Sequence, residues 1–172
     1  MCDMIRRKDD MKINKIKTVD LYTDGGVIKK NPSTIGGTYA CVLVMDDKVQ
    51  YRYSGIITPQ NMRTKKVTNN QMELMAVITG FSLAKKGKHT IEHVYCDSQV
   101  TLGRLYQGWK LNGIPDWMVE MLNEYRPAIL QTTGIHVRGH AGNKWNEECD
   151  RMCNDAGNRY LEWMNNDIAY NN

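Results

Sequence analysis

The sequence predicts a mixed α/β fold in which helices cover both faces of one β-sheet. Three β-like runs follow one another early in the chain, and from there on helical and β-like runs alternate. No internal repeat or low-complexity stretch interrupts the 172 residues, a length typical of one domain with a sizeable core. We therefore expect a single domain built around one sheet.

The three early runs have the patterns of strands. In residues 18–26 (TVDLYTDGG), Tyr22 and Asp24 share one face because successive side chains of a strand point to opposite sides. Residues 38–45 and 49–57 are rich in β-branched and aromatic side chains, and a short polar turn joins them. These three strands are expected to form an antiparallel meander.

The rest of the chain alternates between helical and strand patterns, each bounded by glycine, proline or polar residues. The expected elements are a helix through Leu74, Val77, Ile78 and Phe81, a strand over 91–97, a short helix through Leu102 and Leu105, a helix carrying Trp117, Met121 and Leu122, a strand over 134–139, and a long helix from Trp145 to Trp163.

The ends of the chain differ from its centre. Residues 1–16 are predicted to be a flexible lead-in, residues 17–165 the domain, and residues 166–172 a polar tail. The N-terminus lacks the apolar centre of a secretory signal, and no window reaches the ~18 to 20 apolar residues of a membrane span. The five cysteines are scattered, mostly in apolar runs, which is typical of reduced thiols. We expect a cytoplasmic protein that does not contact a membrane.

The charge of the chain permits a polyanionic partner without demanding one. The formal net charge is +4 and the pI is about 8.7, and the lysines occur in pairs at 29–30, 65–66 and 85–86 instead of in one basic stripe. Charge alone is therefore weak evidence for nucleic-acid binding.

Two predicted strands end alike, with Tyr-Thr-Asp at 22–24 and Tyr-Cys-Asp at 95–97. If a helix connects these strands by a right-handed crossover, they lie parallel, and Asp24 and Asp97 meet at the carboxyl edge of the sheet. Two carboxylates that are forced together repel each other and need a cation or a shared proton. Their hard oxygen ligands suit Mg²⁺ or Mn²⁺.

Each acidic candidate also has a purely structural interpretation. An aspartate at a strand end is a common turn former. Glu73 stands three residues after Asn70, as in a helix capping box. Asp150 and Asn146 are four residues apart on the last helix, and a solvated helix face explains that pair equally well. The spacing alone leaves both interpretations open.

Four segments, in this order, resemble the type 1 ribonuclease H family, in a form without the basic protrusion that bacterial members often carry. The resemblance covers residues from about Thr18 to Ala156, and it implies a ribonuclease H-like fold with three antiparallel strands followed by two parallel ones. The segments are YTDGG (22–26), TNNQMEL (68–74), VYCDSQ (94–99) and GHAGNKWNEECD (139–150).

The resemblance implies endonucleolytic hydrolysis of the RNA strand of an RNA–DNA hybrid, leaving 5′-phosphate and 3′-hydroxyl ends. We expect a monomer, and no obligate protein partner is evident from the sequence. The resemblance also implies a cofactor of two Mg²⁺ ions, for which Mn²⁺ substitutes. The implied catalytic and metal-binding residues are Asp24, Glu73, Asp97 and Asp150, with His140 assisting proton movement or product release. The implied nucleic-acid contacts are Gly25, Gly26, Asn31, Thr68, Asn69, Asn70, Gln71 and Asn146.

The chain departs from the family pattern in its basic residues. The stretch 108–117 (GWKLNGIPDW) holds one lysine where the basic protrusion is expected, and Gln71 stands where arginine is frequent. Hybrid affinity then depends on other cations, such as Lys65, Lys66 or the basic run at 6–8.

Three other interpretations are open to the sequence. A non-catalytic hybrid-binding module on the same fold is the main functional alternative, although a pure binder gains nothing from acids that repel phosphate. Integrases and junction resolvases have a related fold but lack the TNN and GHAG segments. A zinc site of His136, His140, Cys149 and Cys153 is less expected, because both cysteines belong to the apolar stripe of the last helix.

Overall fold

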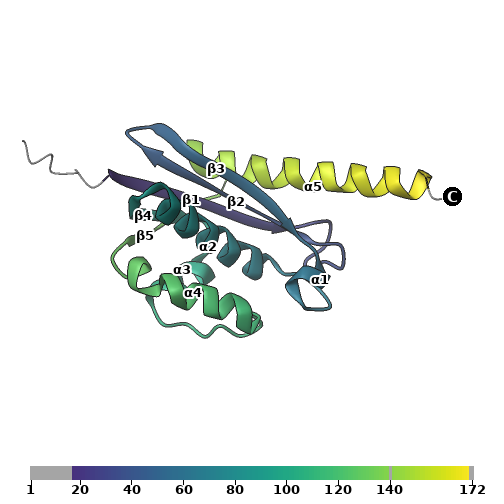
Figure 1. Cartoon of the computed structure of the whole chain (residues 1–172), viewed down its shortest axis with the longest axis horizontal. Helices are drawn as coiled ribbons and strands as arrows, with labels where there is room; N and C mark the ends of the chain where they lie inside the picture. Colours follow the sequence, from purple (N-terminus) through teal and green to yellow (C-terminus); the bar gives the residue numbers. More distant parts are fainter. Residues whose placement is uncertain (1–16, 140, 171–172) are drawn as a thin grey trace, which may run out of the picture.

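The structure, a computed structural model, describes residues 17–139 and 141–170, with the side chains of 168–170 left out (Figure 1). The predicted lead-in 1–16 and His140 lie outside the described residues. A five-stranded sheet in the order β3-β2-β1-β4-β5 forms the centre. Its strands are β1 (Lys17–Val27), β2 (Gly37–Met45), β3 (Lys48–Ile57), β4 (His89–Cys96) and β5 (Thr133–His136).

The sheet is mixed as the sequence predicts. β1, β2 and β3 pair antiparallel, whereas β4 pairs parallel with β1, and β5 parallel with β4. The predicted fold class, a five-stranded mixed sheet with three antiparallel strands and then two parallel ones, is therefore confirmed. β5 ends at His136, so residues 137–139 form a loop in place of the last part of the predicted strand.

Helices cover both faces of this sheet, with α2, α3 and α4 on one side and α5 on the other (Figure 1). No helix in the described part of the chain is long and apolar enough for a membrane span. Residues 166–170, predicted as a polar tail, continue the last helix. The helices are α1 (Pro59–Met62), α2 (Asn69–Gly87), α3 (Gln99–Tyr106), α4 (Asp116–Ile129) and α5 (Lys144–Tyr170).

The alternation of β1 divides the core into two layers. Leu21 is fully buried toward α2, whereas Tyr22 packs on the other face in a smaller cluster with the α5 residues Cys149 and Cys153. The four cysteines in the described part are buried and free of disulfides. The Sγ atoms of Cys149 and Cys153 lie 3.4 and 3.5 Å from the carbonyl oxygens of Tyr22 and Asp24. These are the contacts of core cysteines, and among the described residues neither thiol belongs to a metal-ligating group.

Helix α2 approaches the sheet closely at its first turn. A Cβ built on Gly25 of β1 would lie 2.3 Å from the backbone nitrogen of Glu73 and 2.3 Å from the carbonyl carbon of Met72. Both neighbours are backbone atoms, which cannot rotate away. The absence of a side chain at Gly25 therefore lets the start of α2 rest directly on the end of β1.

We predict that Gly25→Ala lowers the free energy of unfolding by about 2 kcal/mol or more, because the added methyl forces α2 away from the sheet. Chemical denaturation followed by circular dichroism measures this loss. The matched control is Gly26→Ala, where the new Cβ would meet only the Thr38 Oγ1 atom, 3.8 Å away. Similar losses for the two variants would contradict the packing constraint at Gly25.

Candidate active site

Asp24 and Asp97 stand at the same edge of the sheet. Tyr22 pairs with Tyr95 in the parallel register of β1 and β4, and the two rings stack with centroids 4.3 Å apart and planes 5° from parallel. Asp24 follows Tyr22 by two residues within β1 and shares its face, whereas Asp97 is the first residue after β4. The prediction that the two strand ends come together is confirmed by this register.

Glu73 reaches the same edge from α2. The helix begins with Thr68 as its N-cap, and Gln71 completes the capping box, with the Gln71 Oε1 atom accepting from the Thr68 N–H at 2.9 Å. The interpretation of Glu73 as the partner of an Asn70 cap is therefore wrong, because Thr68 begins the helix two residues earlier. Glu73 is buried, 6% exposed, and its backbone rests on Gly25 beside Asp24.

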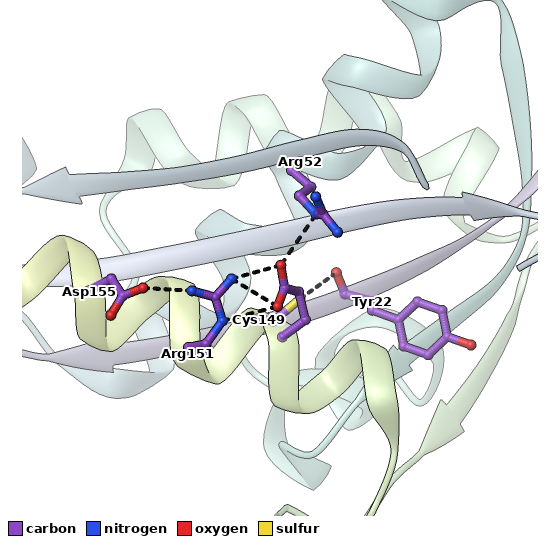
Figure 2. Close-up of polar contacts among 6 residues, drawn as sticks. Tyr22, Arg52, Cys149, Arg151 and Asp155 are labelled. Carbon is purple, nitrogen blue, oxygen red and sulfur yellow. Dashed lines mark hydrogen bonds and ion pairs between the residues drawn. The ribbon is translucent and has the colours of Figure 1, made fainter. Parts of the chain in front are cut away.

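Helix α5 supplies Asp150 and is held on the opposite face of the sheet from α2. Its Cys149 hydrogen-bonds the Tyr22 carbonyl, and its Glu148 pairs with Arg52 of β3 at 3.3 Å (Figure 2). Glu148 is also held by Arg151 of the next turn at 2.9 Å. These contacts on either side of Asp150 fix this turn of α5 against the sheet. The partly buried carboxylate of Asp150 is thereby brought near Asp24.

The acids repel one another. Burial raises the pKa of Asp24 from 3.8 to about 6, and the charges of Asp97 and Asp150 contribute to the rise. Burial also raises the pKa of Glu73 well above its usual range, with Asp24 and Asp97 as the charged neighbours. The backbone N–H of Gly25 hydrogen-bonds both carboxylates and partly offsets these shifts. A site that accumulates this much buried negative charge is suited to cations.

The donor atoms fit a divalent metal ion. One carboxylate oxygen each of Glu73 and Asp97 and the Sγ atom of Cys96 lie within 4.8 Å of one another. Carboxylate oxygens are the ligands that Mg²⁺ prefers. Asp24 extends this group, since its charge interacts with both Glu73 and Asp97.

Cys96 is a neighbour of the site that the sequence analysis did not single out. Its thiol lies 3.7 Å from Glu73 Oε2, and its Sγ atom accepts from the Ser98 N–H at 3.4 Å. The alternation of side chains along β4 could have predicted the side on which Cys96 lies, because Cys96 must face away from Tyr95 and toward the α2 side of the sheet. The missing information was where Glu73 lies on that side.

Several predicted nucleic-acid contacts surround the start of α2. Asn69 and Asn70 are exposed, and the Asn69 N–H donates to Oδ1 of Asn31 at 3.2 Å. Thr68 is partly exposed, and its hydroxyl accepts from the Gln71 N–H as the helix cap. The structure therefore brings these four polar residues together beside Glu73.

Gln71 and Asn146 differ from this group because both side chains are buried, at 3% and 2% exposed. Gln71 Nε2 donates to the Gly113 carbonyl at 2.8 Å and so ties α2 to the α3–α4 connection. The Oδ1 atom of Asn146 has no hydrogen-bond partner within the described part of the chain. Both side chains are therefore enclosed by the protein itself.

The loop before α5 also borders the site. A Cβ on Gly139 would lie 3.0 Å from Asp97 Oδ2, and His136 Nε2 lies 3.1 Å from the Asp97 carbonyl oxygen. His140, the predicted proton-transfer residue, follows Gly139 and lies outside the described residues.

Comparison with known proteins assigns the chain to a family. The family model for RNase H matches residues 16–158. A ribonuclease H of Aeromonas salmonicida is 32% identical over 150 residues, which cover 82% of this chain and 90% of that protein. The chain belongs to the RNase H family. The resemblance drawn from the four sequence segments is thereby confirmed.

Solved structures of the RNase H family share this fold. The N-terminal RNase H domain of a Mycobacterium tuberculosis protein is similar with a TM-score of 0.65 and 22% identity, over 86% of this chain and 99% of that one. LC11-RNase H1, solved in complex with an RNA/DNA hybrid, is similar with a TM-score of 0.61 and 20% identity, over 83% of this chain and 99% of that one.

We predict that Asp24→Asn stabilises the metal-free protein at pH 7 and that this gain disappears toward pH 4. The Asp24 carboxyl loses its proton near pH 4 in the unfolded chain but near pH 6 in the folded one. Ionised Asp24 therefore lowers the free energy of unfolding. This loss is absent below pH 4, grows between pH 4 and 6, and reaches up to about 3 kcal/mol above pH 6.

Urea denaturation of the wild type and the variant in EDTA, from pH 4 to 7.5, measures the difference. Asp20→Asn on the same strand is the control, because this carboxylate is partly exposed and contacts His93 at 2.8 Å, away from the four acids. Parallel pH profiles for wild type and Asp24→Asn would show that Asp24 is not destabilised by its surroundings.

Proposed function

We propose that this RNase H family member is an endoribonuclease that hydrolyses the RNA strand of RNA–DNA hybrids, leaving 5′-phosphate and 3′-hydroxyl ends, and that it depends on two Mg²⁺ ions, replaceable by Mn²⁺. The observation that carries the proposal is the convergence of Asp24, Glu73, Asp97 and Asp150 from four separate elements. The names of the curated relatives and the hybrid held by LC11-RNase H1 support the substrate.

The four acids would hold the metal ions. When bound, the ions supply an activated water and charge stabilisation at the leaving oxygen of an in-line displacement. Glu73 and Asp97 are close enough to share one ion, and Asp24 interacts electrostatically with all three other acids. Asp24 is therefore the best placed of the four to contribute to both ions. His140 is proposed to assist proton movement or product release.

The surface beside the acids would hold the hybrid. Asn31, Thr68 and Asn69 are proposed to contact the backbone of the duplex, and Asn70 its minor groove. Gly26 is partly exposed at the end of β1 and has no side chain, so a sugar can approach the backbone there. A contact to a 2′-hydroxyl at that place would distinguish RNA from DNA.

The structure changes the basis for three of the predicted contacts. Gly25 is buried, and the close approach of α2 accounts for its lack of a side chain. Gln71 and Asn146 are buried, and we propose that they support neighbouring segments without touching the hybrid.

We predict that the wild type cleaves end-labelled RNA in a hybrid with Mg²⁺, and that Asp24→Asn slows cleavage by a factor of about 1,000 or more. Hybrid binding should survive or strengthen, because one negative charge near the phosphates is removed. EDTA should abolish cleavage, and single-stranded and double-stranded RNA should remain intact.

The matched control is Asp20→Asn, on the same face of β1, where the carboxylate pairs with His93 at 2.8 Å, away from the four acids. This variant should cleave at close to the wild-type rate. Equal cleavage by Asp24→Asn and wild type would overturn the assignment of the four acids. Binding of the hybrid without cleavage by the wild type would instead favour a non-catalytic hybrid-binding module.

A further inference from the structure

Two loops are joined beside the active site. The loop between β1 and β2 and the loop between α1 and α2 meet where Ser33 and Val67 exchange two backbone hydrogen bonds of 2.8 Å each. The Asn31 side chain adds a third connection, by accepting from the Asn69 N–H. The side chains of both loops therefore belong to one surface.

That surface is cationic. The two loops lie within residues 25–45 and 55–72. These two segments contain five lysine or arginine residues and no aspartate or glutamate. All five side chains are exposed, and none forms an ion pair among the described residues. Since the whole chain carries +4, the remainder is slightly negative. We call this surface the loop patch, made of Lys29, Lys30, Arg63, Lys65 and Lys66.

The loop patch is continuous with the active site. Lys29 follows Asp24 by five residues, so their Cα atoms are at most about 18 Å apart. Lys66 precedes the N-cap Thr68, and the helix rises only about 7.5 Å from there to Glu73. Phosphates follow one another about every 3.4 Å along a duplex, so these cations reach phosphates within about five base pairs of the acids.

The α3–α4 connection, where a basic protrusion would lie, offers little positive charge, since Lys110 is its one lysine. Arg104 of α3 is buried, and its guanidinium donates to the carbonyls of Lys110 and Asn112 at 3.2 and 3.1 Å. Gln71 holds the next carbonyl, that of Gly113. These bonds tie the backbone of the α3–α4 connection to α3 and α2, and they occupy the Arg104 guanidinium, so Lys110 is the one cation that the connection itself exposes.

We propose that the loop patch binds the phosphate backbone of the duplex substrate and supplies the main electrostatic part of its affinity, in place of a basic protrusion. The identity of that duplex as an RNA–DNA hybrid rests on the proposed function. The start of α2 adds to the attraction, because its helix dipole is positive at that end.

Binding of a fluorescently labelled 20-base-pair hybrid in EDTA, followed by anisotropy at several salt concentrations, tests this. Lys65→Ala/Lys66→Ala and Lys29→Ala/Lys30→Ala should each weaken binding about tenfold at 100 mM salt and reduce the salt slope by up to about 2. With Mg²⁺, KM should rise while kcat stays near the wild-type value.

The control is Lys85→Ala/Lys86→Ala, which removes two positive charges from exposed positions about 25 Å away at the other end of α2, where Lys85 pairs with Glu124 at 3.0 Å. It should change affinity less than twofold. Lys65→Arg/Lys66→Arg should restore binding, which separates a loss of charge from a loss of folding.

Patch variants that bind the hybrid as tightly as the wild type would overturn the proposal, even if the wild type cleaves. Equal weakening by the control pair would overturn it too, by showing a general charge effect. Heparin binding by the same variants should be measured in parallel. Patch variants that lose heparin binding but bind the hybrid as the wild type does would contradict the proposal, by assigning the patch to another polyanion. A wild type that binds through the patch but does not cleave would support the patch and contradict the proposed activity.

Discussion

The contact between the end of β1 and the first turn of α2 is the constraint on which the rest of the site depends. The strand and the helix touch directly at Gly25, since a methyl group there would overlap the backbone of Met72 and Glu73. This contact sets the depth at which Glu73 enters the sheet edge beside Asp24. The capping box of Thr68 and Gln71 then fixes where the helix begins, and the loop patch lies immediately before it.

The same arrangement is electrostatically unfavourable when no cation is bound. The pKa values of Asp24 and Glu73 are raised because burial removes water from carboxylates that already repel one another. Conflicts of this kind between stability and local structure are expected at functional sites. The surrounding fold offsets the cost through the two core layers and through the hydrogen bonds that seat α5 on the sheet (Figure 2).

The features that depend on local periodicity were predictable from the sequence. The alternation of β1 correctly placed Tyr22 opposite Leu21, and the matching strand ends correctly brought Asp24 to Asp97. Helix α1 was missed, because four residues contain too little of a helical repeat to be recognised.

Features that depend on contacts between distant segments were not predictable. Gln71 was expected among the nucleic-acid contacts by its place in a motif, and its hydrogen bond to Gly113, 42 residues away, could not be foreseen. Cys96 was not singled out among the cysteines, because its proximity to Glu73 depends on the position of α2 over the sheet. The joining of two lysine pairs in one patch likewise required the bridge between Ser33 and Val67.

If the convergent acids form a metal site, the stability of the folded protein depends on Mg²⁺ through Asp24. Thermal unfolding should be measured in EDTA and in 10 mM Mg²⁺ for the wild type, Asp24→Asn and Asp20→Asn, at the same ionic strength. Mg²⁺ should raise the Tm of the wild type and of Asp20→Asn by several degrees, and that of Asp24→Asn much less. An equal Mg²⁺ response in all three proteins, or none in the wild type, would contradict a metal site at these acids.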